Sequence, residues 1–385
     1  MRKNYPGYLS VCAAGLLFMT LFVASCKKDN KTPTPVVTAK AIASIGLYEV
    51  DTNIVSSAKD TINYKRIFIP ITKVGTQTVQ FYSVFDTGST GMTIGAAGLL
   101  PKSMITSTGI KIPAGQDSTT VNGITVTNQT AIMAYGNSQS EIQEFGNLAY
   151  ATIFIGTQQD GITTARIPIF LYYKIVDVTT GVTTYDHSND VFGVGPGVSY
   201  ASNLIKSPLS YFKTGTNVTN GFKLAQLPKS GFSIGGTFVS DLLTIGLVPD
   251  DLAASSGFVM HPLQYYSQGG YSPDLPVTVT YVNFNGTSKN LAATLLLDTG
   301  TPAISTIADP TAASNIAQLP VGTNITISTS AGFSYTYTSK KSTYITDVVK
   351  PTFTGDPRTI FGLDFFTDNE YLLDYTDHKI GLKNN

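Results

Sequence analysis

Two short motifs carry the residues of this chain that could most readily do chemistry. The stretch VFDTGST places an Asp-Thr-Gly triplet at Asp86, and LLDTGTP repeats the triplet at Asp298. In both copies two apolar residues precede the Asp and a hydroxyl residue follows the Gly. A single Asp-Thr-Gly arises easily in a chain rich in Thr and Gly, and its Asp would then be an ordinary turn residue. Two copies with matching neighbours favour a duplicated functional unit.

A pair of carboxyl groups could hydrolyse a peptide bond if the fold brought them together. Like charges at hydrogen-bond distance cannot both ionise, so one carboxyl keeps a proton while the other becomes a base. Such a pair can take a proton from water and give one to the reacting group, without a metal or a protein nucleophile. The sequence therefore predicts Asp86 and Asp298 as catalytic residues that need no cofactor and no metal. Gly88 and Gly300 are expected to permit tight turns and to present backbone N–H groups to the carboxylates.

Each motif follows a predicted β-hairpin. The segment KRIFIPITKVGTQTVQFYS indicates strand, glycine turn and strand, and LPVTVTYVNFNGTSKNLAATLLL repeats this with Asn285-Gly286 at the turn. Each copy is also followed by an apolar-apolar-Gly sequence, which ends at Gly193 or Gly362. A glycine in a buried strand indicates close approach of another backbone. The repeated unit is thus larger than the triplet.

The composition favours an all-β protein. The chain has 385 residues, of which 42% are apolar and 13% are charged, so it can build a large core. Val, Thr, Tyr and Phe are frequent, and apolar residues rarely recur with helical spacing. The formal net charge is zero and no basic run occurs, which argues against nucleic acid as a partner.

The N-terminus reads as a targeting segment. A basic start is followed by a short apolar run that ends in VASC, which predicts a signal peptide over residues 1–25. The VASC sequence resembles a bacterial lipobox, and the CKKDN that begins there resembles lipoproteins of the Bacteroidetes type. We therefore expect lipidation of Cys26, a flexible linker over residues 26–42, and an outer-membrane lipoprotein that faces the periplasm or the cell surface. The alternative is a plain signal peptide with a chance cysteine.

From about residue 60 to 385, the paired motifs make the chain resemble the pepsin-like aspartic proteases. The resemblance implies an all-β, bilobal fold with two related β-lobes and an active cleft between them. We expect the lobes at 43–240 and 241–385. The stretch AYGNSQSEIQEFG lies where that family has its flap hairpin, and Tyr135 and Gly136 match the Tyr-Gly of the flap.

The resemblance also assigns roles to the residues beside each Asp. Thr87 and Thr299 would form hydrogen bonds across the junction of the lobes, and Ser89 and Thr301 would donate to the outer carboxylate oxygens. The implied function is an aspartic endopeptidase that acts on proteins or peptides as a monomer.

Three departures from the family pattern keep an alternative open. The chain has no Trp, and Thr93 stands where the family often places a Trp that supports the flap Tyr. Ser138 replaces the second glycine of the flap, which is also longer. The second lobe is short between Asp298 and Gly362. The alternative is a non-catalytic surface or periplasmic lipoprotein of the same fold that binds proteins or glycans.

Two further features have simpler interpretations. The stretch YDHSND, with His187, could suggest a metal loop but is expected to be a solvated turn. The pairs Tyr172-Tyr173 and Tyr265-Tyr266 could stack on sugars. Adjacent residues of a strand point to opposite faces, however, so one Tyr of each pair is expected in the core.

Overall fold

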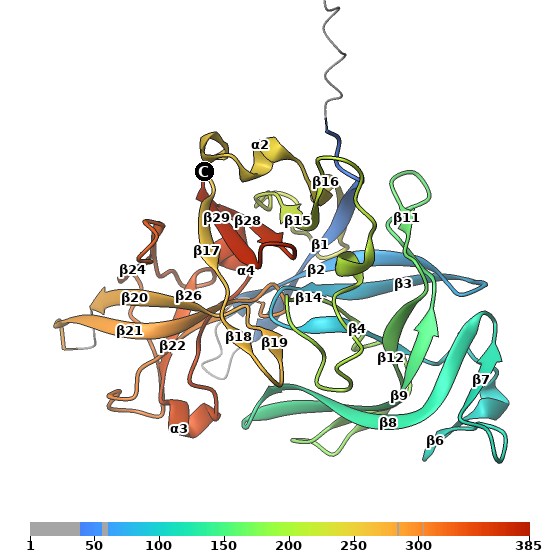
Figure 1. Cartoon of the computed structure of the whole chain (residues 1–385). Helices are drawn as coiled ribbons and strands as arrows, with labels where there is room; N and C mark the ends of the chain where they lie inside the picture. The colour runs from blue at the N-terminus through green and yellow to red at the C-terminus, as the bar shows by residue number, and fades with distance from the viewer. Residues whose placement is uncertain (1–38, 56–60, 283–284, 303) are drawn as a thin grey trace, which may run out of the picture. The chain divides into compact units, whose positions relative to one another are not determined.

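The computed structural model describes residues 39–55, 61–282, 285–302 and 304–385 (Figure 1). The predicted signal peptide, the predicted lipidation site Cys26 and the linker as far as residue 38 lie outside the described residues.

Most strands belong to one large sheet, which has 17 strands in the described part of the chain. These strands are β1 (Ala43–Val55), β2 (Thr61–Val74), β3 (Gln77–Asp86), β4 (Thr90–Gly95), β7 (Ser118–Val121), β8 (Ile124–Asn137), β9 (Ser140–Ala151), β10 (Ile153–Ile155), β11 (Ile162–Thr163), β12 (Ile167–Asp177), β13 (Thr183–Thr184), β14 (Val191–Val194), β15 (Thr219–Leu224), β16 (Thr237–Leu247), β17 (Val259–Pro262), β28 (Asn369–Asp374) and β29 (Lys379–Asn384).

A second sheet of eight strands lies between residues 275 and 361, again counted over the described residues. It contains β20 (Leu275–Val282), β21 (Ser288–Leu297), β22 (Ile304–Ala308), β23 (Ile316–Gln318), β24 (Asn324–Ser328), β25 (Ser334–Thr338), β26 (Ile345–Val349) and β27 (Thr359–Phe361).

The remaining elements are short. Two small hairpins pair β5 (Ile105–Thr106) with β6 (Gly109–Ile110) and β18 (Tyr265–Tyr266) with β19 (Gly270–Tyr271). The helices are single turns: η1 (Lys102–Met104), η2 (Pro208–Tyr211), α2 (Pro249–Leu252), η3 (Ala254–Ser256), α3 (Pro351–Thr354) and α4 (Leu363–Phe366). The all-β fold expected from the composition is confirmed.

Both predicted hairpins are present. Strands β2 and β3 pair antiparallel around Gly75, whose positive φ of 57° suits glycine in a tight turn. Strands β20 and β21 pair antiparallel from Leu275 opposite Leu295 to Val282 opposite Ser288. Burial alternates along β20, as the period of two in its sequence requires. Each hairpin therefore leads directly into one of the Asp-Thr-Gly motifs.

The last two strands return to the large sheet. Strand β28 pairs with β15, and β29 pairs with β17 (Figure 1). Strand β16, which pairs with β1, runs unbroken through residue 240. The division into lobes at residues 240 and 241 stays a prediction, because sheet membership does not follow a single cut in the chain.

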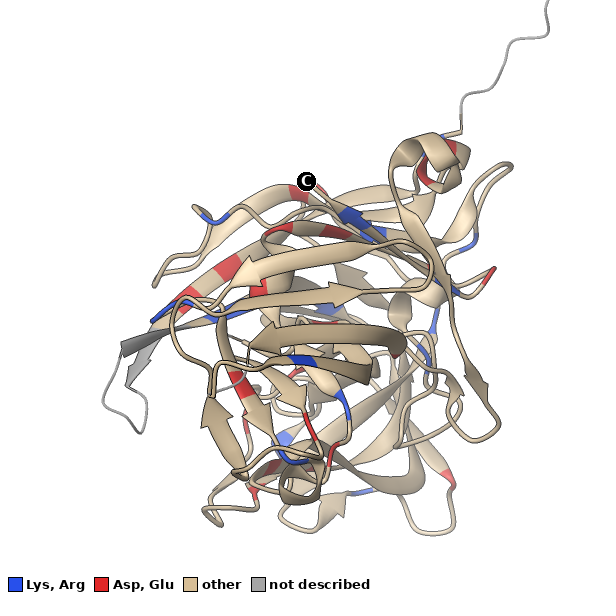
Figure 2. Ribbon diagram, turned by 90° about the vertical axis from the view of Figure 1, so that its left-hand side faces the viewer, with Lys and Arg blue, Asp and Glu red and all other residues tan. Residues whose placement is uncertain are grey.

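Charged positions of both signs occur along the elements that are in view in Figure 2. Figure 2 shows Lys and Arg positions interspersed with Asp and Glu positions on the strands and loops. Among the described residues, none of the helices is both long and apolar enough to span a bilayer.

Candidate active site

The structure brings the two Asp-Thr-Gly loops against each other. Asp86 ends β3, and Asp298 directly follows β21. A Cβ atom on Gly88 would lie 2.6 Å from Asp298 Cγ, and one on Gly300 would lie 2.9 Å from Asp86 Cγ. Neither glycine has a positive φ. The loops therefore need glycine because the opposite carboxyl group occupies the space, and not because the turn demands a special backbone conformation.

Each carboxyl group is held by donors from its own loop. The N–H groups of Gly88 and Ser89 donate to Asp86 Oδ1 at 2.7 and 3.2 Å, and Ser89 Oγ donates to Asp86 Oδ2 at 2.5 Å. Around Asp298, the N–H of Gly300 donates to Oδ1 at 2.7 Å and Thr301 Oγ1 donates to Oδ2 at 2.6 Å. The two halves of the site are thus near copies of each other.

The two threonines of the motifs connect the loops. Thr87 Oγ1 donates to Leu297 O at 2.7 Å and accepts from the N–H of Thr299 at 3.0 Å. Thr299 Oγ1 donates to Phe85 O at 2.6 Å and accepts from the N–H of Thr87 at 3.0 Å. Both threonines are fully buried. This reciprocal network fixes the distance between the carboxyl groups from beneath.

Burial raises the pKa of Asp86 to about 8. Loss of hydration is the largest cause, and the neighbouring Asp298 adds to it through its charge and a hydrogen bond between the two side chains. The donors Ser89 and Gly88 act in the opposite direction but do not offset these effects. The low exposure of Asp86, 7%, and the adjacent Asp298 thus favour the protonated form of Asp86.

The predicted close approach at Gly193 and Gly362 is confirmed. Gly193 in β14 lies beside Asp86, and a Cβ there would be 2.7 Å from Gly91 O and 2.8 Å from Ser89 Oγ. A Cβ on Gly362 would be 2.4 Å from Thr301 O. Gly193 lets β14 lie against the first motif loop, and Gly362, which directly follows β27, does the same for its segment at the second loop.

An arginine also supports the second loop. Arg66 in β2 donates from Nη1 to Gly300 O at 2.7 Å and from Nη2 to the hydroxyl of Tyr64 at 2.6 Å. Its guanidinium lies over the Tyr64 ring, 4.6 Å from the centroid. The sequence offered no signal for this contact, because Arg66 lies in a strand more than 200 residues before the loop that it supports.

The hairpin of β8 and β9 contains the predicted flap residues. Tyr135 is half-buried, and its hydroxyl donates to Thr93 Oγ1 at 3.4 Å. Burial, followed by the charge of Glu144, raises the pKa of Tyr135, and the charge of Asp86 contributes as well. Gly136 has a φ of 99°, and a Cβ there would meet Ser140 O. The hairpin therefore places Tyr135 within electrostatic reach of the carboxyl pair.

A buried glutamate, which sequence reasoning missed, stands behind Tyr135. Glu144 has no exposed surface, accepts from Thr93 Oγ1 at 3.3 Å and accepts from Asn189 Nδ2 at 2.7 Å. Its Oε2 has no hydrogen-bond partner among the described residues. Burial raises the pKa of Glu144 to about 8, which favours its neutral form. The position of Thr93 in place of a family Trp was the one signal that the support of Tyr135 would differ here.

The segment around His187 is a turn in which Tyr185, Asp186 and Ser188 are exposed, as the sequence suggested, but its last residue, Asp190, is buried. Asp190 is 2% exposed and accepts from Tyr172 Oη at 2.5 Å and from Gly95 N at 2.8 Å. His187 Nδ1 lies 2.8 Å from Asp190 Oδ2, and the imidazole stacks on Phe81 at 3.7 Å between centroids. Although burial opposes it, contact with Asp190 leaves the pKa of His187 raised. The segment is a structural network beside β14.

The prediction for the tyrosine pairs is confirmed for one pair and wrong for the other. Tyr172 is buried at 1% exposure, with Tyr173 only half-buried. Tyr265 and Tyr266 are both exposed, at 61% and 51%, in the two-stranded hairpin of β18 and β19.

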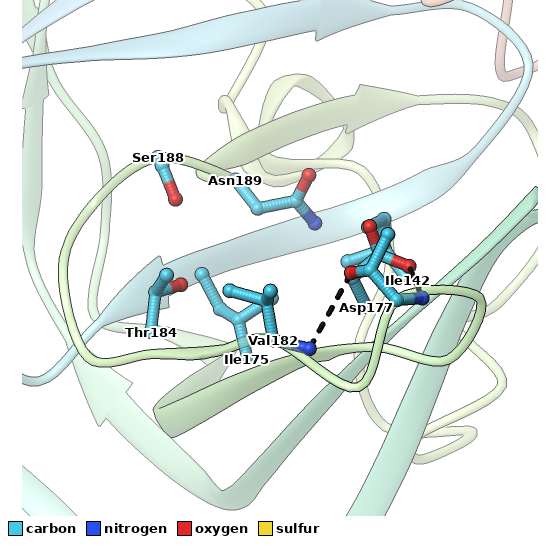
Figure 3. A pocket seen from close by; sticks show the side chains of 8 residues that line it. Ile142, Ile175, Asp177, Val182, Thr184, Ser188 and Asn189 are labelled. Carbon is cyan, nitrogen blue, oxygen red and sulfur yellow. Dashed lines mark hydrogen bonds between the residues drawn. The ribbon is translucent and has the colours of Figure 1, made fainter.

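Two pockets lie away from the carboxyl pair. One, of about 330 Å³, is lined by residues of β9, β12 and the loop before β14, among them Ile142, Asp177 and Asn189 (Figure 3). The other, of about 200 Å³, lies beside Asp309 and Lys289 in the second sheet. Neither lining includes Asp86 or Asp298. We place the candidate site at the carboxyl pair because two adjacent carboxyl groups can act as a general acid and a general base.

Comparison with known proteins gives a likeness in structure alone. No protein-family model matches the chain, and no curated protein matches it in sequence. A crystal structure of the aspartic proteinase from Irpex lacteus matches with a TM-score of 0.54 and 15% sequence identity. The match covers 90% of this chain and 98% of that one. At this level of sequence identity, the structural likeness shows the fold alone. The chain has the all-β, bilobal fold of the pepsin-like aspartic proteinases.

Proposed function

We propose that the protein is an aspartic endopeptidase that hydrolyses proteins or peptides. The observation that carries this proposal is the facing pair of Asp86 and Asp298, each held by a glycine N–H and by a hydroxyl from its own loop. The fold likeness to an aspartic proteinase supports the same reaction class.

The reaction uses the one proton that the pair shares. The ionised carboxylate takes a proton from a water molecule, whose oxygen attacks the carbonyl carbon of the peptide bond. The protonated carboxyl gives its proton to the carbonyl oxygen, which yields a neutral tetrahedral diol. The diol then collapses: the carboxyl that accepted the water proton gives it to the amine nitrogen, the C–N bond breaks, and one diol proton passes to the other carboxylate, so the pair again holds one proton. Low exposure favours Asp86 as the carboxyl that carries the proton in the resting enzyme.

The surrounding residues have positioning roles in this proposal. Ser89 and Thr301 hold the outer carboxylate oxygens in plane, which keeps the inner oxygens directed toward the water. Thr87 and Thr299 fix the separation of the loops. Tyr135 and Gly136 belong to a flap that covers the bound substrate and excludes bulk water.

The direct test is digestion of a mixed peptide library by the purified protein. We expect cleavage by the wild type, and no cleavage by Asp86→Asn or Asp298→Asn, because either change removes half of the proton exchange. Asp377→Asn, at an exposed turn, is the matched control and should cleave normally. A folded wild type that cleaves nothing would overturn the proposal and favour the alternative, a non-catalytic lipoprotein that binds proteins or glycans.

We further propose that the protein is an outer-membrane lipoprotein anchored through acylated Cys26 and that it acts as a monomer facing the periplasm or the cell surface. The support is the lipobox-like VASC sequence and the polar segment that follows it. Wild type should fractionate with membranes, whereas Cys26→Ser should give soluble or unprocessed protein, because acyl chains supply the binding free energy. Identical fractionation of the two proteins would contradict an anchor at this residue.

A further inference from the structure

The tip of the β8–β9 hairpin is hydrogen-bonded to a segment that belongs to the second sheet. Ser138 N donates to Thr354 O at 3.2 Å, and Ser138 Oγ donates to Phe353 O at 2.9 Å. Gln139 Nε2 donates to Phe353 O at 3.0 Å. Phe353 and Thr354 end α3, which lies between β26 and β27 beside the hairpin end (Figure 1). We call these three hydrogen bonds the tip contact.

The acceptors of the tip contact are available because α3 stops after one turn. Carbonyl groups in the last turn of a helix have no donor within the helix. The residue four positions after Phe353 is Pro357, which has no N–H group to give. Gly355 then leaves the helix with a φ of 76°. The carbonyls of Phe353 and Thr354 therefore need donors from elsewhere, and the hairpin tip supplies them.

The donors come from the two residues that turn the hairpin. Asn137 pairs with Ser140, so Ser138 and Gln139 form the turn itself. Asn137 Oδ1 accepts from Gln139 N at 2.9 Å, which fixes the backbone of the turn. A glycine at position 138 could not make the hydroxyl contact to Phe353. The serine that departs from the family pattern is thus the residue that reaches α3.

The tip contact closes a bridge over the candidate active site. Along β9, from Ala151 to Ile142, the hairpin is paired to β12 in the large sheet. Tyr135 of β8 donates to Thr93 Oγ1 in β4, the strand that directly follows the Asp86 motif. At its tip, it is fastened to α3, the element that precedes β27 in the chain, and Phe361 O of β27 accepts from Asp298 N at 2.9 Å. The hairpin therefore spans from the sheet that carries Asp86 to the sheet that carries Asp298.

We propose that Ser138 and Gln139 determine substrate specificity by holding this bridge closed, so that the enzyme admits flexible peptides and rejects the loops of folded proteins. The inference rests on the proposed function. A flexible peptide with a free end can thread beneath a closed bridge. A loop whose two ends are attached to a folded body can reach the carboxyl pair only when the tip contact breaks.

The first test removes the donors. The double variant Ser138→Ala/Gln139→Ala keeps the turn but loses both side-chain hydrogen bonds of the tip contact. Two substrates share one cleavable sequence: a free linear peptide, and the same sequence between two folded domains. We expect kcat/KM for the domain-flanked substrate, relative to the free peptide, to rise about tenfold or more. Ser140→Ala, at the next residue of the hairpin, should leave the ratio unchanged. An unchanged ratio in the double variant would overturn the proposal.

The second test locks the bridge. A Cβ on Gly355 would lie 3.8 Å from Ser138 Cβ, which matches the usual separation in a disulfide. In oxidised Ser138→Cys/Gly355→Cys protein, we expect cleavage of the free peptide to persist while cleavage of the domain-flanked substrate disappears and returns with reductant. The single variants Ser138→Cys and Gly355→Cys are the controls. They measure how far strain at Gly355, or a disulfide to a native cysteine, changes cleavage of the two substrates. Equal cleavage of both substrates by the oxidised protein would refute the bridge, and loss of both would refute the threading of flexible peptides.

The tip contact can be judged apart from catalysis. Mass spectrometry of the double-cysteine protein reports the yield of the 138–355 disulfide whether or not any substrate is cleaved. A high yield without turnover in wild type and variants would mean that the contact is real and the proposed function is wrong. Turnover in wild type without the disulfide would mean that the proposed function stands and the bridge does not.

Discussion

At the scale of single residues, the chemistry of the site depends on which effect controls the charge of Asp86. Hydroxyl and N–H donors stabilise the ionised carboxylate, and from the sequence they predict an activity profile centred below neutrality. Burial and the adjacent Asp298 act in the opposite direction and prevail, which brings the pKa of Asp86 to about 8. The donors could be foreseen from the motif, whereas the burial depends on what the fold packs around it.

This balance predicts the pH profile of the proposed peptidase. The active pair carries one proton, so activity should fall at low pH and fall again at higher pH when the shared proton leaves. Because burial and the adjacent Asp298 raise the pKa of Asp86, the upper limb should lie above the range of an ordinary carboxyl group. Ser89→Ala removes a donor that lowers the pKa of Asp86, so the upper limb should move to higher pH. Initial rates of peptide cleavage across pH 3–10 would measure both limbs. An upper limb that stays in place in Ser89→Ala would contradict this assignment of the hydroxyl.

A second buried acid predicts how stability depends on pH. Glu49 in β1 has no exposed surface, and neither carboxylate oxygen has a hydrogen-bond partner among the described residues. Burial raises the pKa of Glu49 to about 8, although the charge of Lys65 acts to lower it. The folded protein therefore binds a proton that the unfolded chain releases near its ordinary pKa. The stabilisation that protonated Glu49 contributes is fully present below that ordinary value and is lost as pH rises toward 8.

Glu49→Gln should flatten this dependence. The neutral amide has no proton to lose, so the variant should lose less free energy of unfolding than wild type between pH 5 and 8. One pKa unit corresponds to about 1.4 kcal/mol, so the difference should reach several kcal/mol at most. Denaturant unfolding at a series of pH values gives the comparison, with Glu141→Gln in β9 as a control. Parallel curves for wild type and Glu49→Gln would show that Glu49 does not hold a proton in the folded state.

At the scale of elements, the sequence predicted the hairpins because their signals are local. Alternating apolar residues and the glycine turns at Gly75 and Gly286 lie within a few residues of the strands that they connect. The apolar-apolar-Gly strands were also recognisable, since only a neighbouring backbone explains a glycine in a buried strand. The contact from Arg66 to Gly300 O and the tip contact from Ser138 to Phe353 O join residues more than 200 positions apart, and no local pattern encodes such pairs.

Because β14 packs closely against the first motif loop, adding one methyl group at Gly193 should lower both stability and activity. Gly193→Ala places a Cβ within 3 Å of Gly91 O and Ser89 Oγ, so either β14 or the loop must shift. We expect a loss of about 1–3 kcal/mol in unfolding free energy, with a larger loss of kcat than of substrate affinity because Ser89 positions Asp86. Gly235→Ala is the matched control, since its Cβ would meet no atom within 4 Å. Thermal melting and peptide kinetics would together show whether the two effects coincide.

At the scale of the whole molecule, the candidate site exists only because the two sheets are fastened together. Lys65 in β2 and Asp364 in α4 form a buried ion pair at 2.6 Å, and the C-terminal strands β28 and β29 complete the large sheet. The resemblance in sequence suggested two halves that each supply one Asp, and the duplicated motif was sufficient for that. The order of the strands in the large sheet could not be predicted from the sequence. It depends on the pairing of β28 with β15 and of β29 with β17, which are far apart in the chain.

The hydrogen bonds of Thr87 and Thr299 allow a direct test of how the two motif loops are held together. Thr87→Val and Thr299→Val each remove one hydroxyl that both donates and accepts across the junction, and each leaves a buried carbonyl and a buried N–H without a partner. Each change should lower the free energy of unfolding by about 1–3 kcal/mol. Because the two hydroxyls complete one reciprocal network, the double variant should lose less than the sum of the single variants, with a coupling of about 0.5–3 kcal/mol. A double-mutant cycle in denaturant measures this coupling, and Thr180→Val, on an exposed turn, controls for the substitution itself. Strict additivity would mean that the loops are held independently. In that case the separation of Asp86 and Asp298 would have to be set by the packing of the sheets rather than by the motifs themselves.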